Sequence, residues 1–242
     1  MQSDRPPAAK TRRRLWIVGV AVAAFLVLVV VAQALQGSDD EREAPVSSSA
    51  ADTSAPAEHS IVRREAGDPM AIGPVDAPVV LVLWTDMRCP FCALFNRETL
   101  PKLMDEYVRP GKVRIEVHDV AFFGKQSENG AVAARAAGAQ GKFFEYLKAV
   151  YAVAPEGKHP SLPAAKLVKF ASQVGVPDLA RFKADLDDAS LHELARQSNA
   201  TAQGLGVTTV PFFLAGESSI AGAQPVEVFR EFLDDALAKT AG

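Results

Sequence analysis

The chain has 242 residues, with 26 lysines and arginines against 29 aspartates and glutamates, giving a formal net charge of −3. This balance excludes the strong positive charge typical of nucleic-acid-binding proteins, and we expect no nucleic-acid partner. Cys89 and Cys92 are the only cysteines, which excludes a fold held together by several disulfides.

The N-terminal segment has the charge and hydropathy pattern of a membrane anchor. Residues 1–14 carry Arg5, Lys10 and three consecutive arginines against one acid, and residues 15–35 read LWIVGVAVAAFLVLVVVAQAL. As a helix, this apolar run spans about 30 Å, the thickness of one hydrocarbon core. The pattern predicts a transmembrane signal-anchor at 15–35 with a cytoplasmic basic tail at 1–14, and places everything after it outside the cytoplasm.

Two other interpretations of this run stay open. A buried core helix is disfavoured because a soluble helix seldom needs an apolar surface all round. A cleaved signal peptide is the closer alternative, because Ala32-Gln33-Ala34 has the small-x-small form of a cleavage site. The run is longer than the ~7–15 residues of an ordinary signal core, so we expect a single-pass protein of the bacterial cell membrane.

Residues 36–66 are rich in Ser, Ala, Pro and acidic residues and poor in large apolar ones. Such a composition buries too little surface to fold, so it predicts a flexible linker. Residues 67–242 are long enough for a single domain with its own core. Because no separate dimerisation domain is evident, we expect a monomer.

The domain begins with strands and returns to them at its end. A continuous apolar run at 78–84 predicts a strand buried on both faces. A helical period starts at Cys89, with a bend expected near Pro101, and alternation at 113–117 predicts a second strand. A strand hairpin follows at 211–215 and 218–221, and a helix at 225–238.

Between these two groups lies a block without a convincing strand. Helical patterns occur at 131–139, 143–151, 162–173, 178–186 and 190–205. Strands on either side of the block must meet in one sheet, so we predict an α/β fold with an α-helical insertion at about 127–203.

The two cysteines form a C-x-x-C motif where the first strand gives way to a helix. The helix N-terminus favours a thiolate at Cys89, and a free thiol pKa near 8.5 falls to between about 3.5 and 7.5 in such settings. Arg88 is expected to add a favourable charge and Asp86 to oppose it. Cys92, one turn further, is placed to resolve a mixed disulfide.

Two rival roles for the pair are weaker. A zinc site needs two further ligands, and the four histidines are scattered along the chain. A purely structural disulfide closes only a very short loop and restrains the unfolded chain little. We therefore expect redox exchange, with no metal and no cofactor beyond the Cys89–Cys92 disulfide itself.

A second signal lies at Val210-Pro211, just before the late apolar strand. Proline in a sheet is confined to edges, starts or special bends. The Val-Pro bond is compatible with either a cis or a trans peptide, and spacing alone does not decide between them.

CPFC after an apolar strand, the later VPFF and the helical block between them resemble the DsbA-like thiol:disulfide oxidoreductases of the thioredoxin fold. GAVAARAAGAQGKFFEYLKAVYA resembles their helical insertion, and GVTTVPFFLAGESSIAGAQPVEVFREFL their closing segment. The resemblance covers about 68–237. It implies Cys89 as the nucleophile, Cys92 as the resolving thiol, and a cis Pro211 that places the backbone of Val210 against an extended substrate.

The sequence departs from this family at one position. Many relatives carry a buried acid six residues before the first cysteine, where this chain has Leu83. Asp86 is expected nearer the mouth of the site, as a partial substitute or as an ordinary loop or capping residue. Pro90 and Phe91 occupy the two positions between the cysteines without a histidine, which predicts a less strongly oxidising pair. Phe122-Phe123 is expected to pack the insertion rather than to form part of the site.

The expected function is that of an extracytoplasmic oxidoreductase that donates its disulfide to unfolded exported proteins and is recharged by a membrane oxidase. A thiol reductase, a disulfide isomerase and a non-catalytic membrane-anchored binding module remain alternatives.

Overall fold

A computed structural model describes residues 61–240. The predicted basic tail at 1–14, the predicted anchor at 15–35 and the linker up to residue 60 lie outside the described residues. Among the helices within 61–240, none is both long enough and apolar enough to cross a bilayer.

The core is a five-stranded mixed sheet with the strand order β1-β3-β2-β4-β5. The strands β2 and β3 run parallel, and every other neighbouring pair is antiparallel. The bounds are Ala71–Ile72 for β1, Val79–Thr85 for β2, Val113–Asp119 for β3, Phe212–Ala215 for β4 and Ser218–Ala221 for β5. The strands that precede and follow the helical block therefore meet at β2 and β4, as predicted.

Strand β2 lies at the centre of the sheet because its sequence has no polar face. All seven of its residues, VVLVLWT, are buried, and β-branched and aromatic side chains suit a strand covered on both sides. Trp84, 2 % exposed, is a core residue as expected. Strand β1 was not predicted, since two residues give no alternation to detect.

One face of the sheet is covered by α3 (Pro90–Glu98) and α10 (Val226–Thr240). Phe95 of α3, Phe213 of β4 and Phe229 of α10 form an aromatic cluster with ring-centroid distances of 4.6, 5.2 and 4.7 Å. Aromatic pairs at this spacing contribute about 0.5–1.5 kcal/mol beyond their area burial. The cluster fixes the helix that carries the cysteines to the strand that follows Pro211.

The helical run after the cysteines is interrupted, as expected near Pro101. Helix α3 ends before Thr99, a four-residue helix α4 spans Leu100–Leu103, and a π-helical segment η1 spans Met104–Val108.

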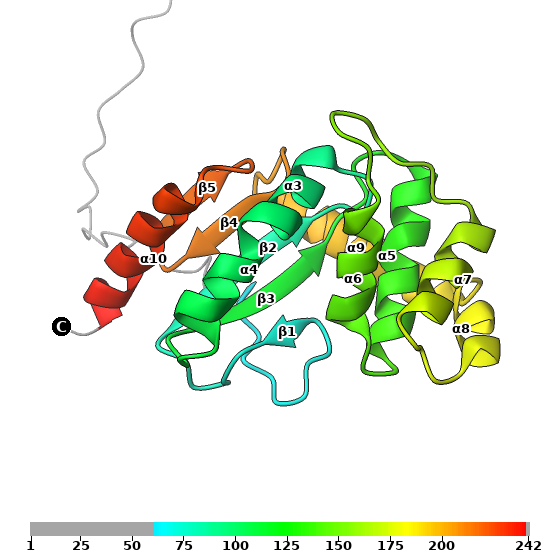
Figure 1. The fold of residues 1–242 in the computed structure, drawn as a ribbon, viewed down its shortest axis with the longest axis horizontal. Coiled ribbons are helices and arrows are strands. Elements are labelled where there is room, and N and C mark those ends of the chain that lie inside the picture. The colour runs from blue at the N-terminus through cyan, green and yellow to red at the C-terminus, as the bar shows by residue number, and fades with distance from the viewer. Residues whose placement is uncertain (1–60, 241–242) are drawn as a thin grey trace, which may run out of the picture. The chain divides into compact units, whose positions relative to one another are not determined.

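The predicted helical insertion is confirmed. Its helices lie together beside the sheet (Figure 1), between β3 and β4 in the chain. They are α5 (Lys125–Gly138), α6 (Phe143–Ala152), α7 (Ala164–Gln173), α8 (Leu179–Asp185) and α9 (Ala189–Gly204).

The predicted linker extends too far at its C-terminal end. Ile61 is buried, and the backbone N–H groups of Arg63 and Arg64 donate to the two carboxylate oxygens of Glu116 at 2.7 and 2.8 Å. Residues 61–66 are therefore attached to β3, and the described part of the domain includes Ile61 instead of beginning at Gly67. Composition did not reveal this because the attachment uses backbone N–H groups and a buried carboxylate instead of apolar side chains.

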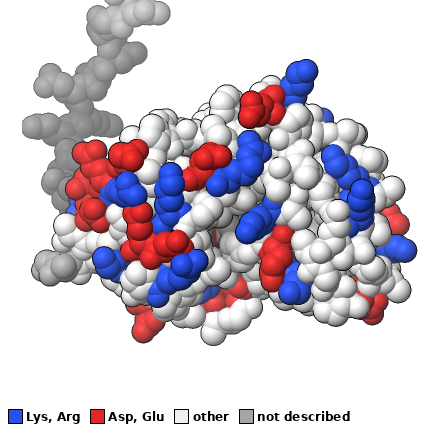
Figure 2. All heavy atoms as spheres, viewed as in Figure 1, with Lys and Arg blue, Asp and Glu red and all other residues white. Residues whose placement is uncertain are grey.

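Charges of both signs are interspersed over the face of the molecule shown in Figure 2.

Candidate functional site

The turn after β2 places Cys89 at the N-terminus of α3. The N–H of Cys89 donates to the carbonyl of Asp86 at 3.0 Å, which closes the turn. Cys89 then serves as the N-cap of α3, and Pro90 occupies the first helical turn, where its missing N–H costs nothing. Strand, turn and helix together thus aim one sulfur at the unpaired N–H groups of a helix end.

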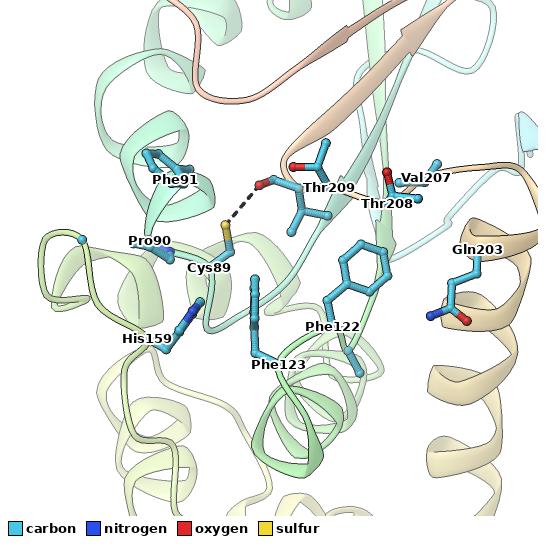
Figure 3. A pocket seen from close by; sticks show the side chains of 13 residues that line it. Cys89, Pro90, Phe91, Phe122, Phe123, His159, Gln203, Val207, Thr208 and Thr209 are labelled. Carbon is cyan, nitrogen blue, oxygen red and sulfur yellow. Dashed lines mark hydrogen bonds between the residues drawn. The ribbon is translucent and has the colours of Figure 1, made fainter. Parts of the chain in front are cut away.

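The sulfur of Cys89 has one contact on each side. It accepts a hydrogen bond from the backbone N–H of Cys92 at 3.2 Å, and its thiol donates to the carbonyl of Val210 at 3.3 Å. Figure 3 shows the second contact crossing from the helix tip to the segment before β4. Both cysteines are present as free thiols.

The two thiols have opposite electrostatic environments. The pKa of Cys89 is lowered, chiefly by a hydrogen bond from the Cys92 thiol and also by the backbone N–H groups of Cys92 and Phe91, against burial and the charge of Asp86. The pKa of Cys92 is raised well above its ordinary value, because burial disfavours its thiolate and the Cys89 sulfur adds to the effect. Cys89 is thus the group that ionises first.

The side of Cys92 that faces away from the groove is closed to solvent. The hydroxyl of Tyr151 donates to the carbonyl of Asp86 at 3.0 Å and lies 2.6 Å from the hydroxyl of Thr85. Because a phenol has one proton, the Thr85 hydroxyl donates in that second contact. Water does not reach the sulfur of Cys92 from this side, because the residues Thr85, Cys92 and Tyr151 are each at most 2 % exposed.

A groove of about 730 Å³ opens at Cys89. Cys89 lines this groove although its residue is only 2 % exposed, whereas Cys92 does not line it. Figure 3 shows Pro90 and Phe91 on the α3 side and Phe122, Phe123 and His159 facing them. The rest of the lining comes from the 207–210 segment and from Ala121, Gly157 and Gln203.

The guanidinium of Arg88 donates to the carbonyls of Phe123 at 2.5 Å and Pro160 at 2.9 Å. Its expected effect on the Cys89 thiol stays a prediction. The planar guanidinium has several N–H donors and is held by these two carbonyl acceptors. The sequence does not reveal which carbonyls lie within its reach.

The expectation that Asp86 lies near the mouth is wrong. Its side chain is fully buried, and it accepts from the N–H groups of Arg88 and Phe122, both at 2.8 Å. Burial raises its pKa, and these backbone hydrogen bonds oppose the rise. Its charge raises the pKa of Cys89, as predicted.

The Val210–Pro211 peptide bond is cis. Val210 lines the groove and turns its carbonyl to Cys89, whereas Pro211 does not line the groove and directly precedes β4. The resemblance placed these two residues correctly, and their role toward a substrate stays a prediction.

Sequence reasoning missed much of the groove. Phe122 and Phe123 were assigned to packing, yet both line it, and the Phe123 ring stacks on His159 at a centroid distance of 4.0 Å. His159, Gln203, Thr208 and Thr209 were not singled out. The single usable signal was the place of Phe122 and Phe123 just after β3, because the ends of parallel strands β2 and β3 meet at the same sheet edge.

The described residues 61–240 contain no group of three or more His, Cys, Asp or Glu side chains with the spacing of a metal site.

Comparison with known proteins decides the family. The sequence profile described as thioredoxin matches residues 65–235, most of the chain. The chain belongs to this thioredoxin family. The expected resemblance to DsbA-like thiol:disulfide oxidoreductases is confirmed at the level of the family.

The chain is also similar to relatives with curated names. The chain is 29 % identical over 144 residues to the probable disulfide bond formation protein D of Bacillus anthracis, covering 58 % of this chain and 66 % of the relative. The chain thus spans just under two thirds of that relative's length. It is 21 % identical over 173 residues to disulfide bond formation protein D of Bacillus subtilis, covering 71 % of this chain and 78 % of the relative.

Solved structures share the thioredoxin fold of this chain. Oxidised BdbD from Bacillus subtilis matches with a TM-score of 0.66 and 21 % identity over 71 % of this chain and 94 % of that one. The α-DsbA1 protein of Wolbachia pipientis matches with a TM-score of 0.63 and 18 % identity over 71 % of this chain and 92 % of that one. At these identities the likeness concerns the fold.

Proposed function

We propose that this protein is an extracytoplasmic thiol:disulfide oxidoreductase that donates the Cys89–Cys92 disulfide to exported proteins. The observation that carries the proposal is the asymmetry of the two sulfurs: Cys89 caps a helix, lines a groove and has a lowered pKa, whereas Cys92 is closed off and has a raised pKa. The names of the curated relatives support the same activity.

The reaction transfers two electrons from the substrate to the pair. A substrate thiolate attacks the sulfur of Cys89, the Cys89–Cys92 bond breaks, and Cys92 leaves as a thiolate that takes up a proton. A second substrate thiolate then attacks the substrate sulfur of the mixed disulfide, and Cys89 leaves as a thiolate. The lowered pKa of Cys89 favours this last step, because a thiol of low pKa is the better leaving group.

An extended substrate segment fits beside the 208–210 backbone. Within residues 61–240, the N–H groups of Thr208, Thr209 and Val210 have no hydrogen-bond partner, and the Val210 carbonyl accepts only from the Cys89 thiol. A peptide strand that pairs here brings its own cysteine to Cys89 while its side chains enter the groove.

The cellular setting rests on the sequence. A signal-anchor at residues 15–35 holds the domain outside a bacterial membrane, where thiols are not kept reduced. A membrane oxidase in the same bilayer recharges the pair, and unfolded exported proteins consume the disulfide.

The test uses the oxidised full-length protein in detergent micelles and a reduced peptide with two cysteines. Wild type converts the peptide to its disulfide form, and Cys89→Ser does not. Equal rates for both proteins would refute an enzymatic role. The reduction potential gives the direction: a value at or below the glutathione couple, about −240 mV, would favour the reductase alternative over donation.

A further inference from the structure

The carboxylate of Asp86 connects the loop before the cysteines to the loop that follows β3. One oxygen accepts from the N–H of Arg88 at 2.8 Å, and the other from the N–H groups of Phe122 at 2.8 Å and Phe123 at 3.4 Å. The side chain is fully buried, so water does not replace these acceptors.

The side chain of Arg88 connects the same loop to two segments on the far side of the groove. Its guanidinium donates to the carbonyls of Phe123 and Pro160, and its own carbonyl accepts from Nδ1 of His159 at 2.9 Å. Arg88 thus contacts both the segment between β3 and α5 and the segment between α6 and α7.

Together these contacts hold one side of the groove, an aromatic wall formed by Phe122, Phe123 and His159. Phe122, Phe123 and His159 lie outside regular helices and strands, so no backbone ladder fixes them. The stacked rings of Phe123 and His159 depend instead on hydrogen bonds to the two residues on either side of Met87.

Resting on the proposed function, we propose that Asp86 and Arg88 are positioning residues that set the affinity of the groove for the residues beside a substrate cysteine. The groove is lined by aliphatic, aromatic and uncharged polar groups together with His159, and by no Asp, Glu, Lys or Arg. The substrate class it fits is an extended segment with an aromatic or large aliphatic residue next to its cysteine. Arg88 acts on substrate binding alone, whereas Asp86 acts on substrate binding and, through its charge, on the pKa of Cys89; the sulfur exchange itself proceeds without the wall.

Arg88→Lys separates these two effects. A lysine keeps the charge but has one ammonium group, which does not reproduce the two-armed contact to both carbonyls. Two reduced substrates are compared: a dithiol peptide with phenylalanine next to a cysteine, and dithiothreitol, which is too small to use the wall. We expect the KM for the peptide to rise about five- to tenfold, the factor that corresponds to one lost hydrogen bond. The kcat for the peptide and the rate with dithiothreitol are expected to stay within twofold.

The control is Arg181→Lys, which changes an exposed arginine on α8 with a 3.6 Å contact to Asp185. It is expected to match wild type with both substrates. An equal loss with dithiothreitol, or an unchanged peptide KM, would overturn the inference. Should Arg88→Lys fail to fold, Asp86→Asn carries the same test through the ratio of peptide to dithiothreitol rates, because an amide cannot accept at both positions.

Hydrogen exchange at the Phe122 and Phe123 amides gives a readout that needs no activity. We expect both amides to exchange faster than in wild type in Arg88→Lys and Asp86→Asn. In Arg181→Lys we expect the exchange rate of wild type. If wild type transfers its disulfide to neither compound, the proposed function fails. The positioning role of Asp86 and Arg88 is then tested by hydrogen exchange alone. Unchanged exchange in both variants would then overturn the positioning role.

Discussion

The thiol of Cys89 donates a hydrogen bond to the carbonyl of Val210, which lies 121 positions later in the chain. The whole helical insertion lies between them in the sequence. The contact exists because β4 pairs with β2 across the gap, with Trp84 opposite Phe212. The sulfur of Cys89 and the backbone of Val210 therefore stay in contact only while β2 and β4 remain paired.

The lowered pKa of Cys89 predicts a strong difference in reactivity between the two thiols. In the reduced protein, Cys89 is expected to be alkylated by iodoacetamide with a midpoint below the ordinary ~8.5 of a free thiol. Cys92 is expected to remain unmodified until well above that pH, because burial raises its pKa. Mass spectrometry of the alkylated peptides as a function of pH measures both.

Cys92→Ala provides the matched control for this titration. The hydrogen bond from the Cys92 thiol is the largest cause of the lowered pKa of Cys89, so its removal is expected to move the midpoint upward. A midpoint at or above 8.5 in wild type would contradict the argument, as would a downward shift in the variant.

The charge of Asp86 predicts that Asp86→Asn makes the pair more oxidising. The carboxylate raises the pKa of Cys89, so its loss stabilises the thiolate and with it the reduced form. A stabilised reduced form has a higher reduction potential, and a tenfold change in the equilibrium constant corresponds to about 30 mV. We expect a rise of about 10–30 mV in redox equilibria against glutathione. A lower potential in the variant would show that lost backbone contacts outweigh the charge.

The sheet and the helical block were predictable because each depends on local pattern. The run VVLVLWT has no polar face, and each helix of the insertion is bounded by Gly, Pro or short polar breaks. The position of Cys89 followed from the strand-to-helix change and Pro90.

The groove was not predictable because it depends on contacts between distant segments. Nothing near Phe123 in the sequence indicates that His159 stacks on it, and the carbonyl acceptors of Arg88 lie 35 and 72 residues away. Residues 61–66 were assigned to the linker for the same reason, since their attachment is to Glu116, more than fifty residues later.

The burial of Glu116 predicts a large loss of stability in Glu116→Gln. Its carboxylate accepts from Arg63 N, Arg64 N and Nε of Arg114, the last at 2.8 Å, and it is fully buried. An amide places a donor against one of these donors and leaves the Arg114 charge unpaired, which costs about 3–5 kcal/mol for a buried pair. Urea unfolding measures this loss. Glu193→Gln, which breaks an exposed pair with Arg196, is expected to change stability by less than about 1 kcal/mol.

The lowered pKa of Glu116 also fixes the direction of the pH dependence. Its stabilisation is fully present above the ordinary glutamate pKa of about 4.3 and is lost as the pH falls through the lower pKa of the folded state. Glu116→Gln is therefore expected to lose less stability than wild type on acidification below about pH 4.3. Parallel pH profiles for the two proteins would contradict this assignment.

Gly130 of α5 lies close to Met87 in the loop before the cysteines. A Cβ at this position would lie 2.8 Å from Cβ of Met87 and 3.3 Å from Leu162, and Met87 is 1 % exposed. Alanine in a helix interior ordinarily stabilises by up to about 1 kcal/mol over glycine. Here we expect Gly130→Ala to destabilise by about 1–3 kcal/mol, because neither backbone can move away without losing its own packing.

Gly204→Ala is the matched control, since a Cβ at Gly204, the last residue of α9, meets nothing within 4 Å. It is expected to be neutral or slightly stabilising in urea unfolding. Because Met87 lies two residues before Cys89, Gly130→Ala is also expected to change the alkylation rate of Cys89, and Gly204→Ala to leave it unchanged. A Gly130→Ala protein as stable and as reactive as wild type would show that the redox loop tolerates displacement, and that α5 does not determine where the sulfur of Cys89 lies.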